Sequence, residues 1–217
     1  MIVKLVKGDS IMIAIVDYEA GNLTSVKRAL DYLGLESKIS PHPNEILSAE
    51  RIIFPGVGHA ASAMKFLKAR KLDNALHDAF TSGIPILGIC LGTQIILSHS
   101  EEGDTKCLGI IDGDCPKFKL ENRLLKIPHI GWNTVKQLKP HPVLKGISNN
   151  DEFYFVHSYY PQPSDTASIL AVSDYEIEFP VIIGCKNLVA TQFHPEKSGP
   201  VGLQILSNFS TWDGVSC

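Results

Sequence analysis

Short apolar runs alternate with helix-like segments through the first half of the chain, and this alternation limits the possible folds more than any other feature. Residues 11–16 form a continuous apolar run that ends at Asp17, as expected for a strand buried on both faces. Further strands are predicted at 52–54, where Pro55 and Gly56 break the run, and at 84–89. The alternation predicts strand–helix units around a parallel sheet.

Apolar residues at helical spacing fill the intervals between these strands. They predict a helix from about residue 22 to the glycine at 34, a long helix around 62–82, and a helical segment at 91–97. In the second half, strands are predicted at 153–156, 168–172, 181–185 and 188–193, before a last helix at about 200–209. No repeat or linker divides this pattern, so one domain is expected over 12–213. Residues 1–11 are expected to be an extension outside it, because the run from Met12 reads like a natural start.

Composition narrows the classes of function. The 217 residues carry a formal net charge of −3 without a basic block, which argues against a nucleic-acid partner or an acidic membrane surface. No apolar run reaches the roughly 20 residues of a membrane span. The five cysteines are odd in number and lack the short paired spacing of zinc or redox sites. A reduced cytoplasmic protein without a metal or cofactor is therefore expected.

The sequence Gly-Ile-Cys-Leu-Gly at 88–92 stands between a predicted buried strand and a predicted helix. This arrangement is typical of a nucleophile elbow, where a tight turn excludes Cβ atoms at the flanking positions. The helix N-terminus favours the thiolate of Cys90, and the N–H of Leu91 is placed to donate to an oxyanion. A buried structural cysteine is the alternative reading.

A candidate base follows the strand at 188–193. Pro195 favours an extended backbone at His194, and in an extended segment residues two apart share a side. Glu196 can therefore orient the imidazole of His194, as in a catalytic triad with a cysteine nucleophile. His59 and His157 are the rival bases, because both neighbour other candidate segments.

The segment Pro-Gly-Val-Gly at 55–58 follows a strand and can approach a ligand closely through its backbone. The N–H of Val57 is a candidate for the second oxyanion donor. A plain tight turn explains this segment nearly as well. No one of the three segments around Cys90, Val57 and His194 predicts the function alone, but together they indicate an active site.

In this order, these segments resemble the class I glutamine amidotransferases over residues 12–209. The resemblance implies an α/β domain of three layers, with a mixed, mostly parallel central sheet and a nucleophile elbow. It implies the triad Cys90, His194 and Glu196, and hydrolysis of glutamine without a cofactor. The remaining implied roles are the oxyanion site (Leu91, Val57, Gly56) and the contacts with glutamine (Gly58, Gln94, Ser158, Tyr159).

Further motifs resemble one branch of this family, in which the glutaminase is a subunit that passes ammonia to a cyclase subunit with a (β/α)8 barrel. They include Pro-His-Ile-Gly-Trp-Asn at 128–133 and Tyr-Phe-Val-His-Ser-Tyr at 154–159. The residues that would face the cyclase in the heterodimer are Asn22, Pro128, Trp132, Tyr154 and Lys197.

Three alternatives stay open. Thr93 and Ile130 stand where that branch usually has methionine, and a second branch supplies ammonia to a cyclase-like partner that aminates a sugar of surface polysaccharide. A stand-alone cysteine hydrolase of γ-glutamyl compounds would need no partner. A binding domain that keeps the elbow as a relic would have no activity.

Overall fold

An eight-stranded sheet runs through the centre of the computed structural model, which describes residues 12–19 and 21–215. The predicted extension 1–11 lies outside the described residues. In spatial order, the strands are β2 (Ser37–Ser40), β1 (Ile13–Val16), β3 (Arg51–Gly56), β4 (Ile86–Cys90), β14 (Leu188–Thr191), β13 (Ile177–Cys185), β12 (Ile169–Tyr175) and β9 (Lys136–Gln137). Neighbours are parallel from β2 to β14 and antiparallel from β14 to β9. The predicted mixed sheet is confirmed.

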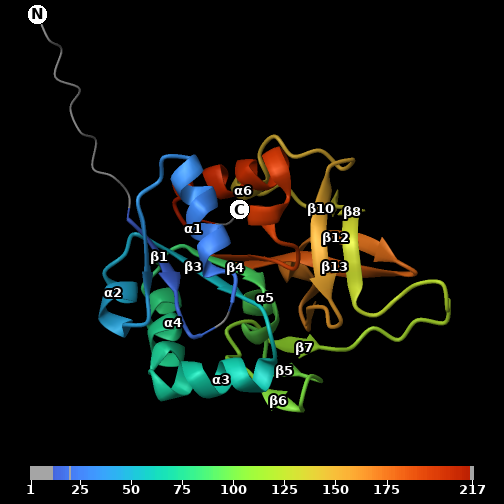
Figure 1. Cartoon of the computed structure of the whole chain (residues 1–217), viewed down its shortest axis with the longest axis horizontal. Helices are drawn as coiled ribbons and strands as arrows, with labels where there is room; N and C mark the ends of the chain where they lie inside the picture. The colour runs from blue at the N-terminus through green and yellow to red at the C-terminus, as the bar shows by residue number, and fades with distance from the viewer. Residues whose placement is uncertain (1–11, 20, 216–217) are drawn as a thin grey trace, which may run out of the picture.

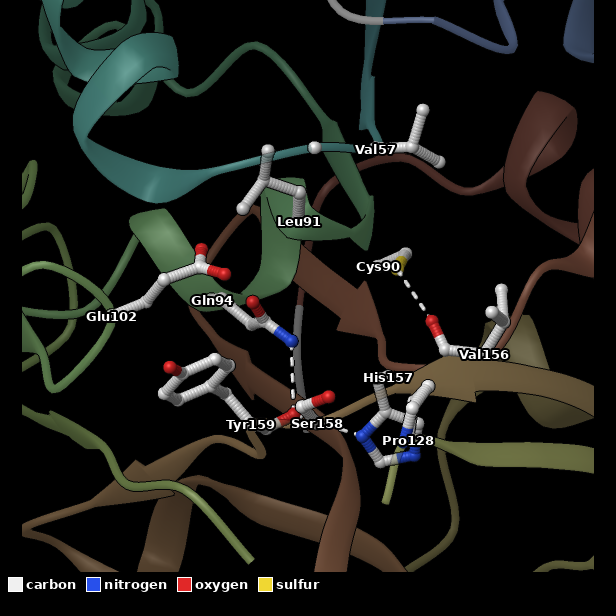
Figure 2. A pocket seen from close by; sticks show the side chains of 11 residues that line it. Val57, Cys90, Leu91, Gln94, Glu102, Pro128, Val156, His157, Ser158 and Tyr159 are labelled. Carbon is white, nitrogen blue, oxygen red and sulfur yellow. Dashed lines mark hydrogen bonds between the residues drawn. The ribbon is translucent and has the colours of Figure 1, made fainter. Parts of the chain in front are cut away.

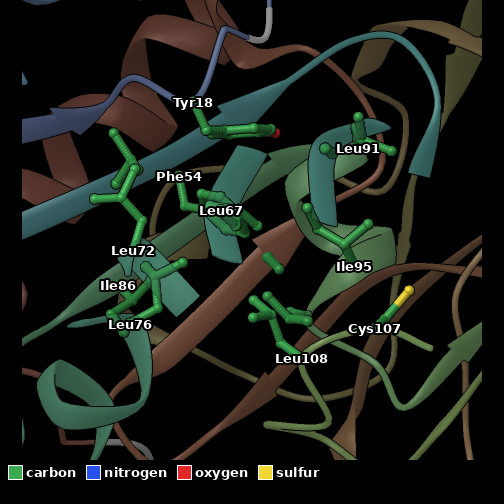
Figure 3. Packing of buried hydrophobic residues seen from close by; sticks show 14 of the residues in the cluster. Tyr18, Phe54, Leu67, Leu72, Leu76, Ile86, Leu91, Ile95, Cys107 and Leu108 are labelled. Carbon is green, nitrogen blue, oxygen red and sulfur yellow. The ribbon is translucent and has the colours of Figure 1, made fainter. Parts of the chain in front are cut away.

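Helices cover both faces of this sheet and make three layers (Figure 1). One face carries α1 (Leu23–Tyr32) and α6 (Gly199–Thr211), and the other carries α2 (Pro43–Leu47), α3 (Ala60–Ala69) and α4 (Leu72–Thr81). Successive side chains of a strand point to opposite faces. In β1, Ile13 and Ile15 accordingly pack with α1 and α6, whereas Ala14 and Val16 belong to the cluster under α3 and α4, which Figure 3 shows in part.

Smaller elements surround the end of β4. The short helix α5 (Leu91–Ile95) follows β4 directly, and an antiparallel two-stranded ribbon pairs β8 (His129–Thr134) with β10 (Glu152–His157). A four-stranded sheet contains β11 (Gln162–Pro163), β7 (Gly113–Cys115), β5 (His99–Ser100) and β6 (Thr105–Lys106). Among the described residues, the remaining elements are three 3₁₀ turns, η1 (Pro142–Leu144), η2 (Thr166–Ser168) and η3 (Pro195–Lys197). In the part of the chain that the structure describes, no helix is long and apolar enough to cross a membrane.

The single long helix predicted around 62–82 is wrong, because α3 and α4 are separate. The buried positions of α3 end with Leu67, and helical spacing would next call for apolar side chains at 70 and 71. Those positions hold Arg70 and Lys71, and the apolar stripe resumes at Leu72. Lys71 has a left-handed φ of 59°, which breaks the helix and restores the stripe to the core side.

Strand β3 also departs from the prediction, because it continues through Pro55 to Gly56. Both residues stay in register with β4, with Pro55 opposite Ile89 and Gly56 opposite Cys90. The first two residues of the candidate oxyanion segment are therefore paired with β4, the strand that ends at Cys90.

Candidate active site

Cys90 occupies a sharp turn between a strand and a helix. It is the last residue of β4, α5 begins at Leu91, and its φ of 54° and ψ of −106° lie outside the regions that side-chain-bearing residues favour. The flanking glycines allow this turn because neighbouring strands pack against them where a Cβ atom would lie. A Cβ at Gly92 would lie 1.9 Å from the carbonyl oxygen of Phe54, and one at Gly88 would lie 2.8 Å from the Cβ of Ala190. The thiol is thereby held at the start of α5.

His194 and Glu196 form a buried pair. Both side chains are fully shielded from solvent, and Nδ1 of His194 lies 2.7 Å from Oε1 of Glu196. A carboxylate can only accept, so Nδ1 carries the proton of this bond. The backbone N–H of His194 donates to the carbonyl of Tyr154 at 3.0 Å, which ties the base to the ribbon.

Electrostatic interactions set the protonation of His194. Burial lowers the pKa of this imidazole, but the Cys90 thiolate, through its charge and as a nearby acceptor, and then Glu196, through its hydrogen bond and its charge, raise the pKa to about 10. Nε2 of His194 makes no hydrogen bond to the residues that the structure describes. His194 is nevertheless close enough to Cys90 for the thiolate to raise the pKa of its imidazole, although Nε2 falls outside hydrogen-bond geometry.

Neither rival histidine has a free nitrogen facing Cys90. His59 is exposed at the start of α3, where its Nδ1 accepts the N–H of Ala61. Both nitrogens of His157 are engaged, since Nδ1 lies 2.8 Å from the carbonyl of Tyr159 and Nε2 lies 3.2 Å from Nδ1 of His129. Burial, with the neighbouring histidines, lowers the pKa of His157 to about 3.

A cavity of about 280 Å³ opens in front of the sulfur (Figure 2). The predicted oxyanion and glutamine-contacting residues that line it are Val57, Gly58, Leu91, Gln94, Ser158 and Tyr159, while Gly56 ends β3 beside them. Gln94 donates from Nε2 to the carbonyl of Tyr159 at 2.9 Å. The segments of Cys90 and Val57 thus line one cavity, whereas the buried His194 does not line it and meets the site through its interaction with Cys90.

The model of the family described as glutamine amidotransferase class-I matches residues 14–211. The chain belongs to this family. Its curated relatives include the imidazole glycerol phosphate synthase subunits HisH of Dehalococcoides mccartyi, 49% identical over 199 residues, and of Nitratidesulfovibrio vulgaris, 49% identical over 203 residues. The alignments cover 91% of this chain and 96% and 95% of those proteins.

Solved structures share the fold of this amidotransferase. PurLQS from Thermotoga maritima is 18% identical with a TM-score of 0.71, and the match covers 92% of this chain and 97% of that one. The glutaminase domain of CTPS from Trypanosoma brucei, with bound acivicin, is 18% identical with a TM-score of 0.62, covering 92% and 94%.

Two residues of this amidotransferase site had no predicted role. Glu102 is the carboxylate among the described residues that line the cavity, and its Oε2 also accepts the N–H of Ala60 at 2.7 Å. Ser198 is 1% exposed and joins the base to the ribbon, because it accepts from the N–H of Tyr154 and donates to the carbonyl of His194. In the sequence alone, a serine and a glutamate look like ordinary surface residues, so only their burial and contacts in the structure reveal these roles.

The residues predicted to face a partner lie in different settings. Trp132 and Tyr154 are paired across β8 and β10 with ring centroids 6.1 Å apart, and Trp132 is 53% exposed. Pro128 lines the cavity and Lys197 is exposed in η3. The amide of Asn22, in contrast, donates to Oε1 of Glu196, so this residue of the amidotransferase also contacts the candidate triad.

Proposed function

We propose that the chain is the glutaminase subunit of an imidazole glycerol phosphate synthase, with Cys90, His194 and Glu196 as its triad. The observation that carries the proposal is Cys90 on a strained elbow at the cavity, with the buried His194–Glu196 pair close enough for the Cys90 thiolate to raise the pKa of His194. The HisH relatives support the choice of enzyme within the family.

The cavity supplies complementary groups for glutamine. The carboxylate of Glu102 would pair with the α-ammonium group, and Oε1 of Gln94 would accept a second hydrogen bond, because Nε2 is already used. The carbonyl of Tyr159 is occupied by Gln94 and His157, so Tyr159, like Ser158, would contact glutamine through a backbone N–H. Gly58 would leave room for the substrate backbone.

The chemistry is acyl transfer in two stages. The Cys90 thiolate attacks the side-chain amide carbon, and the N–H groups of Leu91 and Val57, next to Gly56, stabilise the oxyanion. His194 gives its proton to the amide nitrogen as the C–N bond breaks, which releases ammonia and leaves a thioester. Water then loses a proton to His194 and attacks the thioester, the C–S bond breaks, and glutamate leaves.

The ammonia would pass to a cyclase subunit with a (β/α)8 barrel, for formation of imidazole glycerol phosphate and AICAR in histidine biosynthesis. We place this heterodimer interface at the exposed face of the ribbon, where Trp132 and Tyr154 offer apolar anchors beside Pro128 and Lys197. Docking there would complete the oxyanion site at Val57 and gate hydrolysis. The free thiols of Cys90, Cys107, Cys115 and Cys185 support a reduced, cytoplasmic setting.

The test measures glutamate release by the purified chain, alone and with the cyclase subunit and its ligand. We expect slow hydrolysis alone, strong stimulation in the complex, and loss of activity in Cys90→Ala but not in Cys185→Ala. Equal rates with and without the cyclase would favour a stand-alone γ-glutamyl hydrolase. Stimulation only by a sugar-aminating synthase would assign the chain to the polysaccharide branch, and near-normal turnover by Cys90→Ala would end the mechanism.

A further inference from the structure

A fully buried glutamine lies between the Cys90 sulfur and the side chain of Gln94. Gln192 directly follows β14 and is 0% exposed. Its Nε2 lies 3.8 Å from Sγ of Cys90, and its Oε1 lies 3.1 Å from Nε2 of Gln94. The proposed mechanism gives this side chain no role, although burying an amide is costly unless its polar groups are used.

The donors and acceptors around Gln192 fix which way its amide points. The carbonyl of Tyr159 can only accept, so the group of Gln94 that faces it must be the NH₂ group. The second hydrogen of that NH₂ group points to Gln192, which must therefore present its oxygen there. The NH₂ group of Gln192 is then the one that faces the sulfur.

Besides His194, the sulfur has two polar neighbours among the described residues, and these two have opposite preferences. The carbonyl of Val156, 4.0 Å from Sγ, can accept from a thiol but presents only negative charge to a thiolate (Figure 2). The NH₂ group of Gln192 can donate to a thiolate. A hydrogen bond to a charged acceptor is stronger than one between neutral groups, so the amide favours the ionised form.

We propose that Gln192 is a further catalytic residue, whose amide donates a hydrogen bond to the Cys90 sulfur whenever that sulfur carries negative charge. This occurs twice in a turnover, before attack on the amide and again when the thioester C–S bond breaks and the electron pair returns to sulfur. The other end of Gln192 holds Gln94 with its oxygen toward the cavity. The inference rests on the proposed glutaminase function and deepens it.

Two substitutions separate the two ends of the side chain. Gln192→Glu keeps an acceptor for Gln94 but replaces the donor at the sulfur with a negative oxygen, so kcat should fall while KM for glutamine changes little. Gln192→Met is similar in length and uncharged, and it removes both interactions, so kcat should fall and KM should rise. Gln204→Glu is the matched control, because Gln204 is exposed on α6.

The decisive measurement is independent of glutamine. The rate at which iodoacetamide alkylates Cys90 is followed from pH 5 to 10 by mass spectrometry of the Cys90 peptide. We expect the midpoint of this profile to move by about one pH unit to higher pH in both Gln192 variants, since one charged hydrogen bond contributes roughly a factor of ten to the ionisation equilibrium. Gln204→Glu should match the wild type.

Melting curves establish that the variants are folded, and Gln192→Met is decisive where Gln192→Glu fails to fold because of its buried charge. Alkylation profiles of Gln192→Met that superimpose on the wild type would overturn the proposal. A wild-type chain that releases no glutamate with the cyclase would overturn the proposed function instead, whereas the alkylation comparison would still decide whether Gln192 donates to the sulfur.

Discussion

At the scale of single residues, Asn22 shows how a helix start far away in sequence supports the base. Its amide donates to the same oxygen of Glu196 that receives His194, and its Nδ2 lies 3.4 Å from Nδ1 of His194. The side chain reaches this point from a left-handed backbone with φ of 78°. Asn22 therefore fixes the carboxylate that orients the imidazole.

Removing this amide should slow hydrolysis without unfolding the chain. In Asn22→Gly, the backbone keeps its left-handed conformation at no steric cost, and one charged hydrogen bond to Glu196 is lost. We expect kcat to fall about tenfold, which is the effect of a bond of this kind. Asn44→Gly, at an exposed position of α2, is the control for glutamine turnover. Unchanged kcat in Asn22→Gly would limit Asn22 to a contact with the partner.

Gly92 should tolerate no side chain. In Gly92→Ala, the new Cβ would lie 1.9 Å from the Phe54 carbonyl oxygen, which belongs to the neighbouring strand and cannot move aside. We expect a loss of more than about 3 kcal/mol in the free energy of unfolding, within the range of severe core substitutions. Gly146→Ala has open space around its Cβ and a φ of 80°, so it should lose only about 1 kcal/mol. Urea titrations with similar losses for both would contradict this.

At the scale of elements, the ribbon of β8 and β10 carries a directed chain of hydrogen bonds. Nδ1–H of His157 must donate to the Tyr159 carbonyl, so its Nε2 accepts from Nδ1–H of His129. Nε2 of His129 then faces the amide of Asn133 at 3.5 Å. Both histidines are neutral in this chain, and burial lowers the pKa of His129 to about 4 and that of His157 to about 3.

These lowered pKa values predict that acid destabilises the fold. The unfolded chain protonates its histidines near pH 6.5, whereas the folded chain resists until about pH 4 or below, so the unfolded state binds more protons between these values. The stability that these two histidines contribute is full above pH 6.5 and is lost as the pH is lowered toward 4. For the fully buried His157, the loss from pH 7 to 5 is on the order of 1–2 kcal/mol.

The check is urea unfolding at pH 7 and pH 5. His157→Gln should reduce the difference between the two free energies of unfolding, because glutamine does not titrate and can still donate to Tyr159. His42→Gln, at an exposed position, is the control and should keep the wild-type difference. A pH dependence that is the same in His157→Gln as in the wild type would rule out this origin.

The segments of the candidate site show what the sequence could and could not predict. The elbow, the loop at 55–58 and the His194 segment each carry a local signature, so they could be predicted one by one. The contacts of Asn22 with Glu196 and of Gln192 with Cys90 join residues 174 and 102 positions apart, and no local pattern encodes them. The break between α3 and α4 at Lys71 could have been predicted, because the apolar stripe shifts by one residue there.

At the scale of the whole molecule, Arg51 joins the central sheet to the last helix. Its guanidinium donates to the carbonyls of Phe209 and Trp212 at 3.2 and 2.7 Å, across the end of α6, and the residue is 9% exposed. Burial lowers the pKa of Arg51 from its usual value. A helix ends with carbonyls that need outside partners, and here one side chain from β3 supplies two donors.

Arg51→Met should therefore loosen the C-terminal end. The Trp212 carbonyl would lose its guanidinium donor and the Phe209 carbonyl would keep only the N–H of Trp212, so we expect a drop of about 2 kcal/mol in the free energy of unfolding. Hydrogen exchange should accelerate in α6 before it changes in β1 or β3. Arg28→Met, at an exposed position of α1, provides the control. Uniformly unchanged exchange in Arg51→Met would show that packing alone holds α6.

The ribbon also has a consequence for how such a chain can diverge. Across β8 and β10, one face presents Ile130, Trp132 and Tyr154 outward, while His129, Phe155 and His157 point into the core beside the cavity. Substitutions at outward positions can recruit a different partner, whereas those at inward positions disturb catalysis. The rate of amino-acid substitution should therefore alternate along these strands, high at each outward position and low at each inward one.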